Sequence, residues 1–279
     1  TFGANLKETK YLNLIALMKI ATNKDTGITS ATFNYTYNND NYLTSISKDN
    51  NLVASYQYNI RGFLTNENIK NSYEVNYEYD RNGNILKKKK VDLSNDETIK
   101  EDLFTYDSIY KDRLVSYNNI SFNYNSDKPL FISSVTKDNI VYNFIYKNNI
   151  LSEINWEDDT NIKYEYNESF QRIKKYINNQ LVKKYYYEND LLIKEEGINN
   201  TLYFLYDHSN MLYGFILNNT STYYYVRDVM GNIIGIANSI GNSVVKYEYD
   251  AFGNILNIEQ GNSNIGDINP FRYKGYYYD

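Results

Sequence analysis

Two adjacent carboxylate pairs are the first residues in this sequence that could do chemistry. They are Asp158–Asp159 and Glu195–Glu196, and glycoside hydrolysis needs two carboxyl groups roughly 5–9 Å apart across the scissile bond. Neighbouring residues of a strand point to opposite faces of a sheet, so neither pair is expected to converge on one substrate. We therefore expect no catalytic residue and no enzymatic activity in this chain.

Other reactive side chains are scarce. His208 is the only histidine and there is no cysteine, which excludes a His-based triad, a multi-His metal site, disulfides and thiolate ligands. His208 is expected to be a turn residue after Asp207. No glycine-rich loop precedes a helix, and one turn carboxylate per repeat is too few for calcium. The sequence thus predicts no metal-binding or cofactor-binding residue and no cofactor.

The charge balance narrows the possible partners. A net charge of −5 and a pI near 5.1 argue against a nucleic-acid partner, because phosphates require a basic face. The basic run Lys87–Lys90 is expected to be a solvated strand end. No stretch reaches the roughly 18 apolar residues of a membrane helix, and nothing at the start resembles a signal peptide. Thr1 and Asp279 are interpreted as positions inside a longer protein.

An aromatic-x-Tyr pattern recurs along nearly the whole chain, and its second members are 18 to 27 residues apart. Such a period indicates a repeat architecture. Both rings of a pair share one face of a strand. The twelve pairs are Tyr35/Tyr37, Tyr56/Tyr58, Tyr77/Tyr79, Phe104/Tyr106, Phe122/Tyr124, Phe144/Tyr146, Tyr164/Tyr166, Tyr185/Tyr187, Phe204/Tyr206, Tyr223/Tyr225, Tyr247/Tyr249 and Phe271/Tyr273.

Turn residues follow the second aromatic position. Asn or Asp comes next in eight of the twelve copies, and its side chain can bond the backbone two residues on. In the clearest copies Gly follows and supplies a positive φ. These eight residues are Asn38, Asn59, Asp80, Asp107, Asn125, Asn167, Asp207 and Asp250. A short apolar return strand comes after each turn, so each unit is expected to be a β-hairpin.

The two aromatic positions differ in chemistry. The first is Tyr seven times and Phe five times, so its oxygen is optional, whereas the second is Tyr in every pair. We predict that the second hydroxyl forms a hydrogen bond to a neighbouring turn or backbone group in most units.

Because a single hairpin is marginal in water, the hairpins are expected to stack edge to edge. The fold class expected is all-β, with repetitive antiparallel β-hairpins forming a spiral, curved sheet. Residues 1–30 are assigned to a leading strand or incomplete repeat, with Leu12–Ile20 as a strand whose partner is missing. Residues 31–222 are assigned to hairpin repeats. The acidic segment Asp92–Asp102 is expected to be a protruding loop.

The repeats resemble those of a known family. Aromatic-x-Tyr-Asp-x-x-Gly-Asn with a period near 20 is similar to the YD repeat of RHS proteins, and residues 223–279 resemble the start of the RHS repeat-associated core. The signature residues are Tyr37, Tyr58, Tyr79, Asp80, Gly83, Tyr106, Tyr124, Tyr146, Tyr166, Tyr187, Tyr206, Tyr225, Asp228, Gly231, Tyr249, Asp250, Gly253 and Tyr273.

This resemblance implies a structural, non-catalytic part of a shell. Such shells enclose and help to deliver a C-terminal toxin or effector domain in bacterial polymorphic toxins and wall-associated proteins. The implied partners are that domain and the remaining shell repeats. A secreted or cell-surface location is implied, and the many Asn, Ile, Lys and Tyr residues suggest a Gram-positive bacterium. Self-cleavage, which follows the core in many members, is expected to be absent from this piece.

A second function stays open beside the shell. An aromatic-rich repeat array could instead bind cell-surface or cell-wall carbohydrate, or a cell-surface receptor, through exposed rings. Repeats of that kind usually use Trp and Gly, and this chain has one Trp and 13 Gly. Rings buried between strands would favour the shell.

Overall fold

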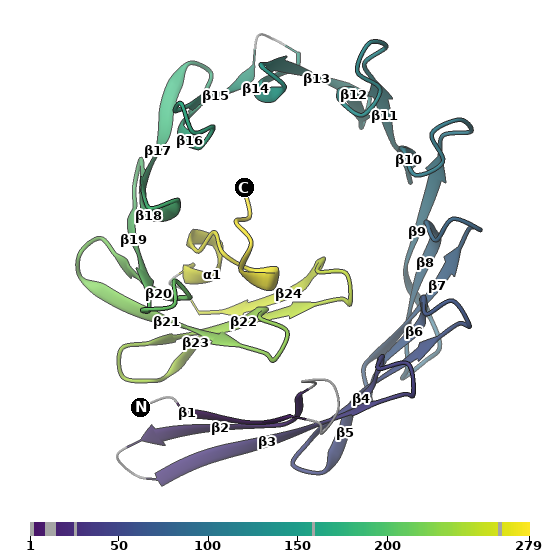
Figure 1. Cartoon of the computed structure of the whole chain (residues 1–279), viewed down its shortest axis with the longest axis vertical. Helices are drawn as coiled ribbons and strands as arrows, with labels where there is room; N and C mark the ends of the chain where they lie inside the picture. The colour runs from purple at the N-terminus through teal and green to yellow at the C-terminus, as the bar shows by residue number, and fades with distance from the viewer. Residues whose placement is uncertain (1–2, 9–14, 25–26, 158–159, 262–263) are drawn as a thin grey trace. The chain divides into compact units, whose positions relative to one another are not determined.

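A computed structural model describes residues 3–8, 15–24, 27–157, 160–261 and 264–279 (Figure 1). The chain divides into two compact units, residues 1–143 and 144–279, and each is described by itself. In the described ranges every strand pairing is antiparallel, and no helix is both long and apolar enough to cross a bilayer.

The first unit is a sheet whose strands follow one another in chain order. They are β1 (Gly3–Glu8), β2 (Ile15–Lys24), β3 (Gly27–Tyr37), β4 (Leu43–Lys48), β5 (Asn51–Tyr58), β6 (Leu64–Ile69), β7 (Tyr73–Tyr79), β8 (Ile85–Asp92), β9 (Thr98–Tyr106), β10 (Leu114–Tyr117), β11 (Ile120–Tyr124), β12 (Ile132–Lys137) and β13 (Ile140–Lys147), which contains the boundary between the units.

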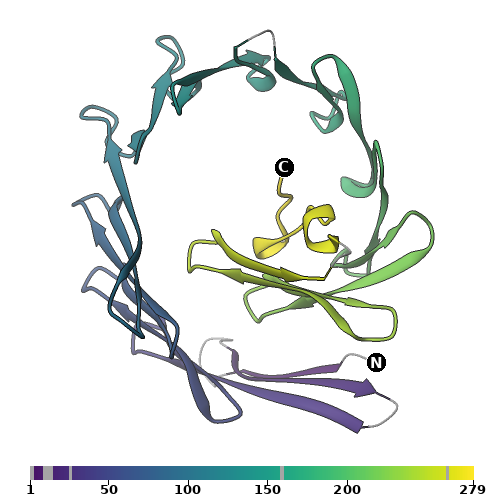
Figure 2. The ribbon, with the colours of Figure 1, turned by 180° about the vertical axis from the view of Figure 1, so that it is seen from behind.

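The second unit continues the same hairpin pattern. Its strands are β14 (Ile150–Asn155), β15 (Asn161–Tyr166), β16 (Arg172–Ile177), β17 (Gln180–Glu188), β18 (Leu191–Gly197), β19 (Thr201–Tyr206), β20 (Leu212–Leu217), β21 (Ser221–Arg227), β22 (Ile233–Asn238), β23 (Ser243–Tyr249) and β24 (Ile255–Gln260). Helix α1 (Ile265–Ile268) and the 3-10 turn η1 (Tyr273–Gly275) follow. Both figures show this sheet curving around the C-terminal residues (Figures 1 and 2). The expected all-β fold of antiparallel hairpins in a curved sheet is confirmed.

A β-bulge recurs at one place in the repeat. The register shifts immediately before the second aromatic position in eight hairpins, for example between Gln57 and Tyr58 and between Glu248 and Tyr249. A bulge re-aims the side chain that follows it. It thereby turns the second ring toward the preceding hairpin.

Two kinds of turn recur along the chain. After the second aromatic position, all eight Asn or Asp residues expected to start a turn accept the backbone N–H two residues on. Six further turns are two-residue hairpin turns in which both residues have positive φ, as type I′ turns require. Their residues are Asp49–Asn50, Asp138–Asn139, Asn148–Asn149, Asn178–Asn179, Asn189–Asp190 and Asn218–Asn219.

Three expectations need correction. Residues 12–14 lie outside the described residues, but residues 15–24 form β2, which pairs with β1 and β3, so the partner is not missing. The segment 92–102 is a loop only in part, because β9 begins at Thr98 and its Asp102 is buried, accepting hydrogen bonds from Tyr117 and Asn118. The basic run Lys87–Lys90 lies half-buried within β8 and is not a solvated strand end.

Alanine substitutions at three glycines distinguish the cost of backbone strain from the cost of a steric clash. Gly83 has φ +94°, and a Cβ there would lie 2.7 Å from Cζ of Phe63, whereas Gly231 has φ +85° with open space around it. We expect Gly231→Ala to destabilise by about 1 kcal/mol through strain alone, and Gly83→Ala by about 2–3 kcal/mol. Gly261→Ala, with neither strain nor contact, is the control and should change the free energy of unfolding by less than ~0.5 kcal/mol. Equal losses for all three in urea titrations would contradict the argument.

Candidate interaction site on the inner face

The second aromatic position joins neighbouring hairpins. Its hydroxyl donates to a backbone carbonyl at the start of the preceding return strand, as Tyr58 does to Leu43 at 2.8 Å and Tyr79 to Leu64 at 2.6 Å. The same bond is made by Tyr106, Tyr124, Tyr166, Tyr187, Tyr206 and Tyr249. The prediction that this hydroxyl bonds to neighbouring backbone in most units is confirmed.

One unit departs from the expected register. The bulge of β21 precedes Arg227, and Arg227 donates from Nη2 to the carbonyl of Leu212, the bond that a tyrosine makes elsewhere. Arg227 therefore occupies the second position, and Tyr225 is the first ring of its unit. The hydroxyl of Tyr225 donates to Asn269 instead. The expectation that Tyr225 is a second-position residue is wrong.

The last expected unit is not a hairpin. Phe271 forms an isolated bridge with Tyr277, and Tyr273 lies in η1, where its hydroxyl donates to the carbonyl of Ala251 in the preceding turn. Residues 264–279, which we name the C-terminal segment, leave the sheet after β24 and lie on the concave side of the second unit (Figures 1 and 2). The face of β15–β24 that it contacts is named the inner face.

Each first ring on the inner face has a cross-strand partner on the return strand of its hairpin. Three successive hairpins of the second unit have Lys175 opposite Tyr164, Glu195 opposite Tyr185 and Phe215 opposite Phe204. Cross-strand neighbours lie close enough to interact directly. Successive hairpins therefore present a cation, an anion and an apolar ring.

The C-terminal segment contacts these hairpins one after another. The ring of Phe271 meets that of Phe204 edge-on at a centroid distance of 4.9 Å. The Tyr277 hydroxyl donates to Glu195, which also pairs with Lys183 at 2.7 Å. The side chain of Asp279 forms ion pairs with Arg172 and, at 2.8 Å, with Lys175. Apolar, polar and charged groups of the segment thus match those of the sheet.

The pKa values of Asp279 and Tyr164 are consistent with this match. Burial alone would raise the pKa of Asp279, but hydrogen bonds and charges from Lys175 and Arg172 outweigh it and hold the pKa below its ordinary value. Burial, with a smaller contribution from the Asp279 charge, raises the pKa of Tyr164 to about 12. The ion pair therefore favours an ionised Asp279 beside a neutral Tyr164 at neutral pH.

Asn269 fixes the start of the segment. Its side chain is fully buried, accepts hydrogen bonds from the Tyr225 hydroxyl and the Phe271 amide, and donates to the Tyr247 hydroxyl and the Phe271 carbonyl. A buried amide with all its groups satisfied specifies one local conformation. Around it the buried core of this unit gathers, including Phe215, Ile236 and Tyr247.

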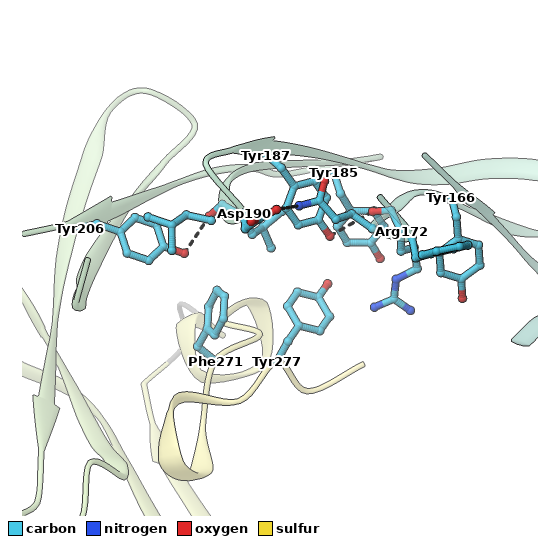
Figure 3. A pocket seen from close by; sticks show the side chains of 12 residues that line it. Tyr166, Arg172, Tyr185, Tyr187, Asp190, Tyr206, Phe271 and Tyr277 are labelled. Carbon is cyan, nitrogen blue, oxygen red and sulfur yellow. Dashed lines mark hydrogen bonds between the residues drawn. The ribbon is translucent and has the colours of Figure 1, made fainter. Parts of the chain in front are cut away.

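A pocket of about 540 Å³ adjoins the segment (Figure 3). The rings of Phe271 and Tyr277 rise toward it from the C-terminal segment, while Tyr187, Tyr206 and Tyr166 line it from the sheet. Its volume lies within the range of roughly 300–1,000 Å³ common for ligand pockets. Mostly aromatic walls make it suited to an apolar guest.

The structure also locates the residues that were considered for catalysis or metal binding and rejected. Glu195 and Glu196 lie on opposite faces, because Glu195 contacts Tyr277 while Glu196 accepts from Tyr186. Asp158 and Asp159 lie outside the described residues. His208 is an exposed turn residue, as expected. Among the described residues no three His, Asp or Glu side chains gather as metal ligands.

Sequence reasoning missed the residues that hold the C-terminal segment. Arg172, Lys175, Glu195 and Asn269 belong to no repeat signature. A charged residue opposite a first ring was not a sufficient clue, because Glu67 and Lys88 lie opposite the first rings Tyr56 and Tyr77 of other hairpins.

A pair of adjacent tyrosines tests the inter-hairpin bond. Tyr187 bonds the carbonyl of Arg172 at 3.1 Å, whereas Tyr186 is on the opposite, exposed face. Tyr187→Phe should lower the free energy of unfolding by about 1 kcal/mol. Tyr186→Phe is the control and should change it by less than ~0.5 kcal/mol. Equal effects of the two substitutions in denaturant titrations would argue against a stabilising role for the hydroxyl.

Curated proteins similar to part of this chain are large. The tRNA3(Ser)-specific nuclease WapA of Bacillus spizizenii and the tRNA nuclease WapA of Bacillus subtilis are each 35% identical over 127 residues. Each match covers 44% of this chain and 5% of the relative. The chain thus spans a small fraction of the length of these relatives.

Solved structures share the fold. A Tc holotoxin pore of Photorhabdus luminescens matches with a TM-score of 0.66, and the TcdB2-TccC3-TEV complex with 0.67. Both matches are 13% identical and cover 99% of this chain and 16% of the other. The family model described as Teneurin YD-shell matches residues 25–279. Antiparallel hairpins joined by tyrosine hydroxyls, together with this match, thus place the protein in the Teneurin YD-shell family, with a structural role in forming the shell.

Proposed function

We propose that this chain is a non-catalytic wall segment of a bacterial YD-repeat shell that encloses, and helps to deliver, a toxin or effector domain of the same polypeptide. The observation that carries the proposal is the docking of residues 264–279 on the concave side of the second unit. A domain joined after Asp279 would begin on that side. A secreted or cell-surface location belongs to the same proposal.

The division of the chain supports this role. We propose that residues 31–222 are plain repeats and that residues 223–279 begin the repeat-associated core. Both departures from the regular pattern, Arg227 in place of a second tyrosine and the inward C-terminal segment, fall in the latter range. Regular repeats extend the sheet. In residues 223–279 the regular pattern changes and the chain then leaves the sheet.

Burial disfavours the carbohydrate-binding alternative. The first rings Tyr77, Tyr185 and Tyr247 are each less than 5% exposed. Sugars stack on exposed rings, so these three are not accessible to a polysaccharide. We expect no retention of the protein on cell-wall polysaccharide, and retention would support the alternative.

Protease protection tests the enclosure. In the full-length protein, the domain that follows the shell should resist added protease at least tenfold longer than the same domain produced alone. Cleavage at equal rates in both settings would overturn the proposal. Hydrolytic turnover by residues 1–279, abolished by replacing one carboxylate, would overturn the non-catalytic assignment.

A further inference from the structure

The pocket between the inner face and the C-terminal segment is already shaped before any guest enters. Three of its wall rings are fixed because their hydroxyls donate to backbone carbonyls: Tyr166 to Leu151, Tyr187 to Arg172 and Tyr206 to Leu192. Phe271 and Tyr277 form the opposite wall (Figure 3). A guest would therefore lose little free energy in ordering the site.

These hydrogen bonds also restrict which guests the pocket can bind. The three wall hydroxyls are already hydrogen-bonded, so they offer ring faces rather than donors. At the rim, Gln171 donates to Asp190 at 2.8 Å. A sugar needs a partner for nearly every hydroxyl and would leave several unsatisfied here, at a cost in free energy for each. The walls favour an aromatic guest.

One polar group in the pocket lacks a partner. The hydroxyl of Tyr185 is buried and forms no hydrogen bond of normal geometry with the described residues. After burial and the Arg172 charge, the neighbouring Tyr277 hydroxyl acts on the pKa of Tyr185 as a hydrogen-bond neighbour, but it donates its own hydrogen to Glu195. A buried unsatisfied donor is unusual in a folded protein. It would be satisfied by a guest that carries a carbonyl or hydroxyl oxygen beside its ring.

The charges of the lining are balanced. Among its described residues, Arg172 and Asp190 are the charged ones, and they carry opposite signs. Arg172 is moreover paired with Asp279. A phosphate or other anion would find no excess positive charge, so the lining suits a neutral guest.

The geometry points to a receptor site for an aromatic residue of an extended polypeptide, with its ring between the tyrosine walls and an oxygen accepting from Tyr185. The same face already binds Phe271 and Tyr277 of the chain itself, and the pocket is continuous with that interface. This inference rests on the proposed function, because it assigns the guest to the enclosed domain.

Small amides test the chemistry of the pocket without the enclosed domain. We expect N-acetyl-tyrosinamide to bind with a dissociation constant on the order of 1 mM, as befits a ligand of this size, in saturation-transfer NMR. N-acetyl-leucinamide and N-acetylglucosamine should bind at least fivefold more weakly. Absence of tyrosinamide binding, or preference for the sugar, would overturn the assignment.

The Tyr185→Phe substitution tests whether the guest binds beside the Tyr185 hydroxyl. Since the hydroxyl has no partner in the free protein, this substitution should leave the melting temperature unchanged or raised. Tyrosinamide binding should nevertheless weaken about fivefold, the effect of roughly one hydrogen bond. Tyr186→Phe on the opposite face is the matched control and should bind normally. Equal affinities for the Tyr185 variant and the unsubstituted protein would overturn the location.

A cross-link separates this inference from the proposed function. Phe170 lines the pocket and is 65% exposed, so Phe170→p-benzoylphenylalanine places a photoreactive ring at its rim. Illumination of the full-length protein should join this position to the following domain. Tyrosinamide binding without that cross-link would retain the pocket's chemistry and reject the enclosed domain as its guest. Cross-linking without tyrosinamide binding would support enclosure and reject the receptor site.

Discussion

The protein will unfold cooperatively as the pH is raised from about 10 to about 12, well before its arginines titrate. The cause is the set of second-position tyrosines, whose hydroxyls join neighbouring hairpins. Burial raises the pKa of Tyr79 and Tyr206 to about 12, from an ordinary value of 10.0. The pKa is also raised, mainly by burial, in the other second-position tyrosines, which are Tyr37, Tyr58, Tyr106, Tyr124, Tyr146, Tyr166, Tyr187 and Tyr249.

The sign follows from proton linkage. Above pH 10 the unfolded chain loses phenolic protons that the folded protein still holds, so the unfolded state binds fewer protons and stability falls as pH rises. The stabilisation is fully present below pH 10 and is lost as pH passes through the raised values in the fold. Because ten second-position tyrosines contribute, the transition should be steep.

Two signals measured together test this result. The part of the phenolate absorbance that appears above the ordinary tyrosine pKa should change together with far-ultraviolet circular dichroism, in one transition. Tyr58→Phe combined with Tyr79→Phe removes two titrating groups and should make the alkaline transition shallower, although the variant starts less stable. Phenolate absorbance that is complete around pH 10 while the sheet remains intact would show that the second-position hydroxyls titrate freely.

The hairpins could be predicted because their determinants are local. An Asn or Asp that bonds the N–H two residues on, and a tyrosine whose face is fixed by alternation, depend on neighbours within one repeat. The acceptor of the second hydroxyl lies in the adjacent repeat, as with Tyr79 and Leu64. The period near 20 therefore brings it close in every copy.

The exception at Arg227 could not be found by matching residue types. A guanidinium reaches the carbonyl of Leu212 as a phenol would, because both present an N–H or O–H donor at the end of a flat group. With Arg227 as the second position, the unit lies 21 residues after Tyr206 and 22 before Tyr249. The more even spacing was the clue that aromatic matching obscured.

The inner-face site could not be predicted from the sequence for a different reason. Arg172 and Asp279 are 107 positions apart, and their contact depends on how far the sheet curves before the C-terminal segment folds back. Repeat periodicity describes each hairpin and its neighbour but contains no information about such long-range pairing. The charges of Lys175 and Glu195 do not mark the site either, because Glu67 and Lys88 hold the same position in other hairpins.

Replacing Asn269 should be the most destabilising single substitution in the C-terminal segment. Asn269→Ala removes a fully buried side chain and leaves the Tyr225 hydroxyl and the Phe271 amide and carbonyl without their partner. Each buried group left unsatisfied costs about 1–3 kcal/mol, and we expect a total loss of about 3–5 kcal/mol in urea titrations. Asn257→Ala, at an exposed position of β24, is the control and should cost less than ~0.5 kcal/mol.

A double substitution separates loss of the hydrogen-bond network from loss of packing. If the orphaned Tyr225 hydroxyl carries part of the penalty, Tyr225→Phe should cost less in the Asn269→Ala background than in the unsubstituted protein, with a coupling energy of about 1 kcal/mol or more. Hydrogen exchange should then show faster exchange first in residues 264–279, since the network fixes the start of that segment. Additive losses, or exchange that rises equally throughout β15–β24, would mean that Asn269 only fills space and that the segment is held by its ring and ion-pair contacts alone.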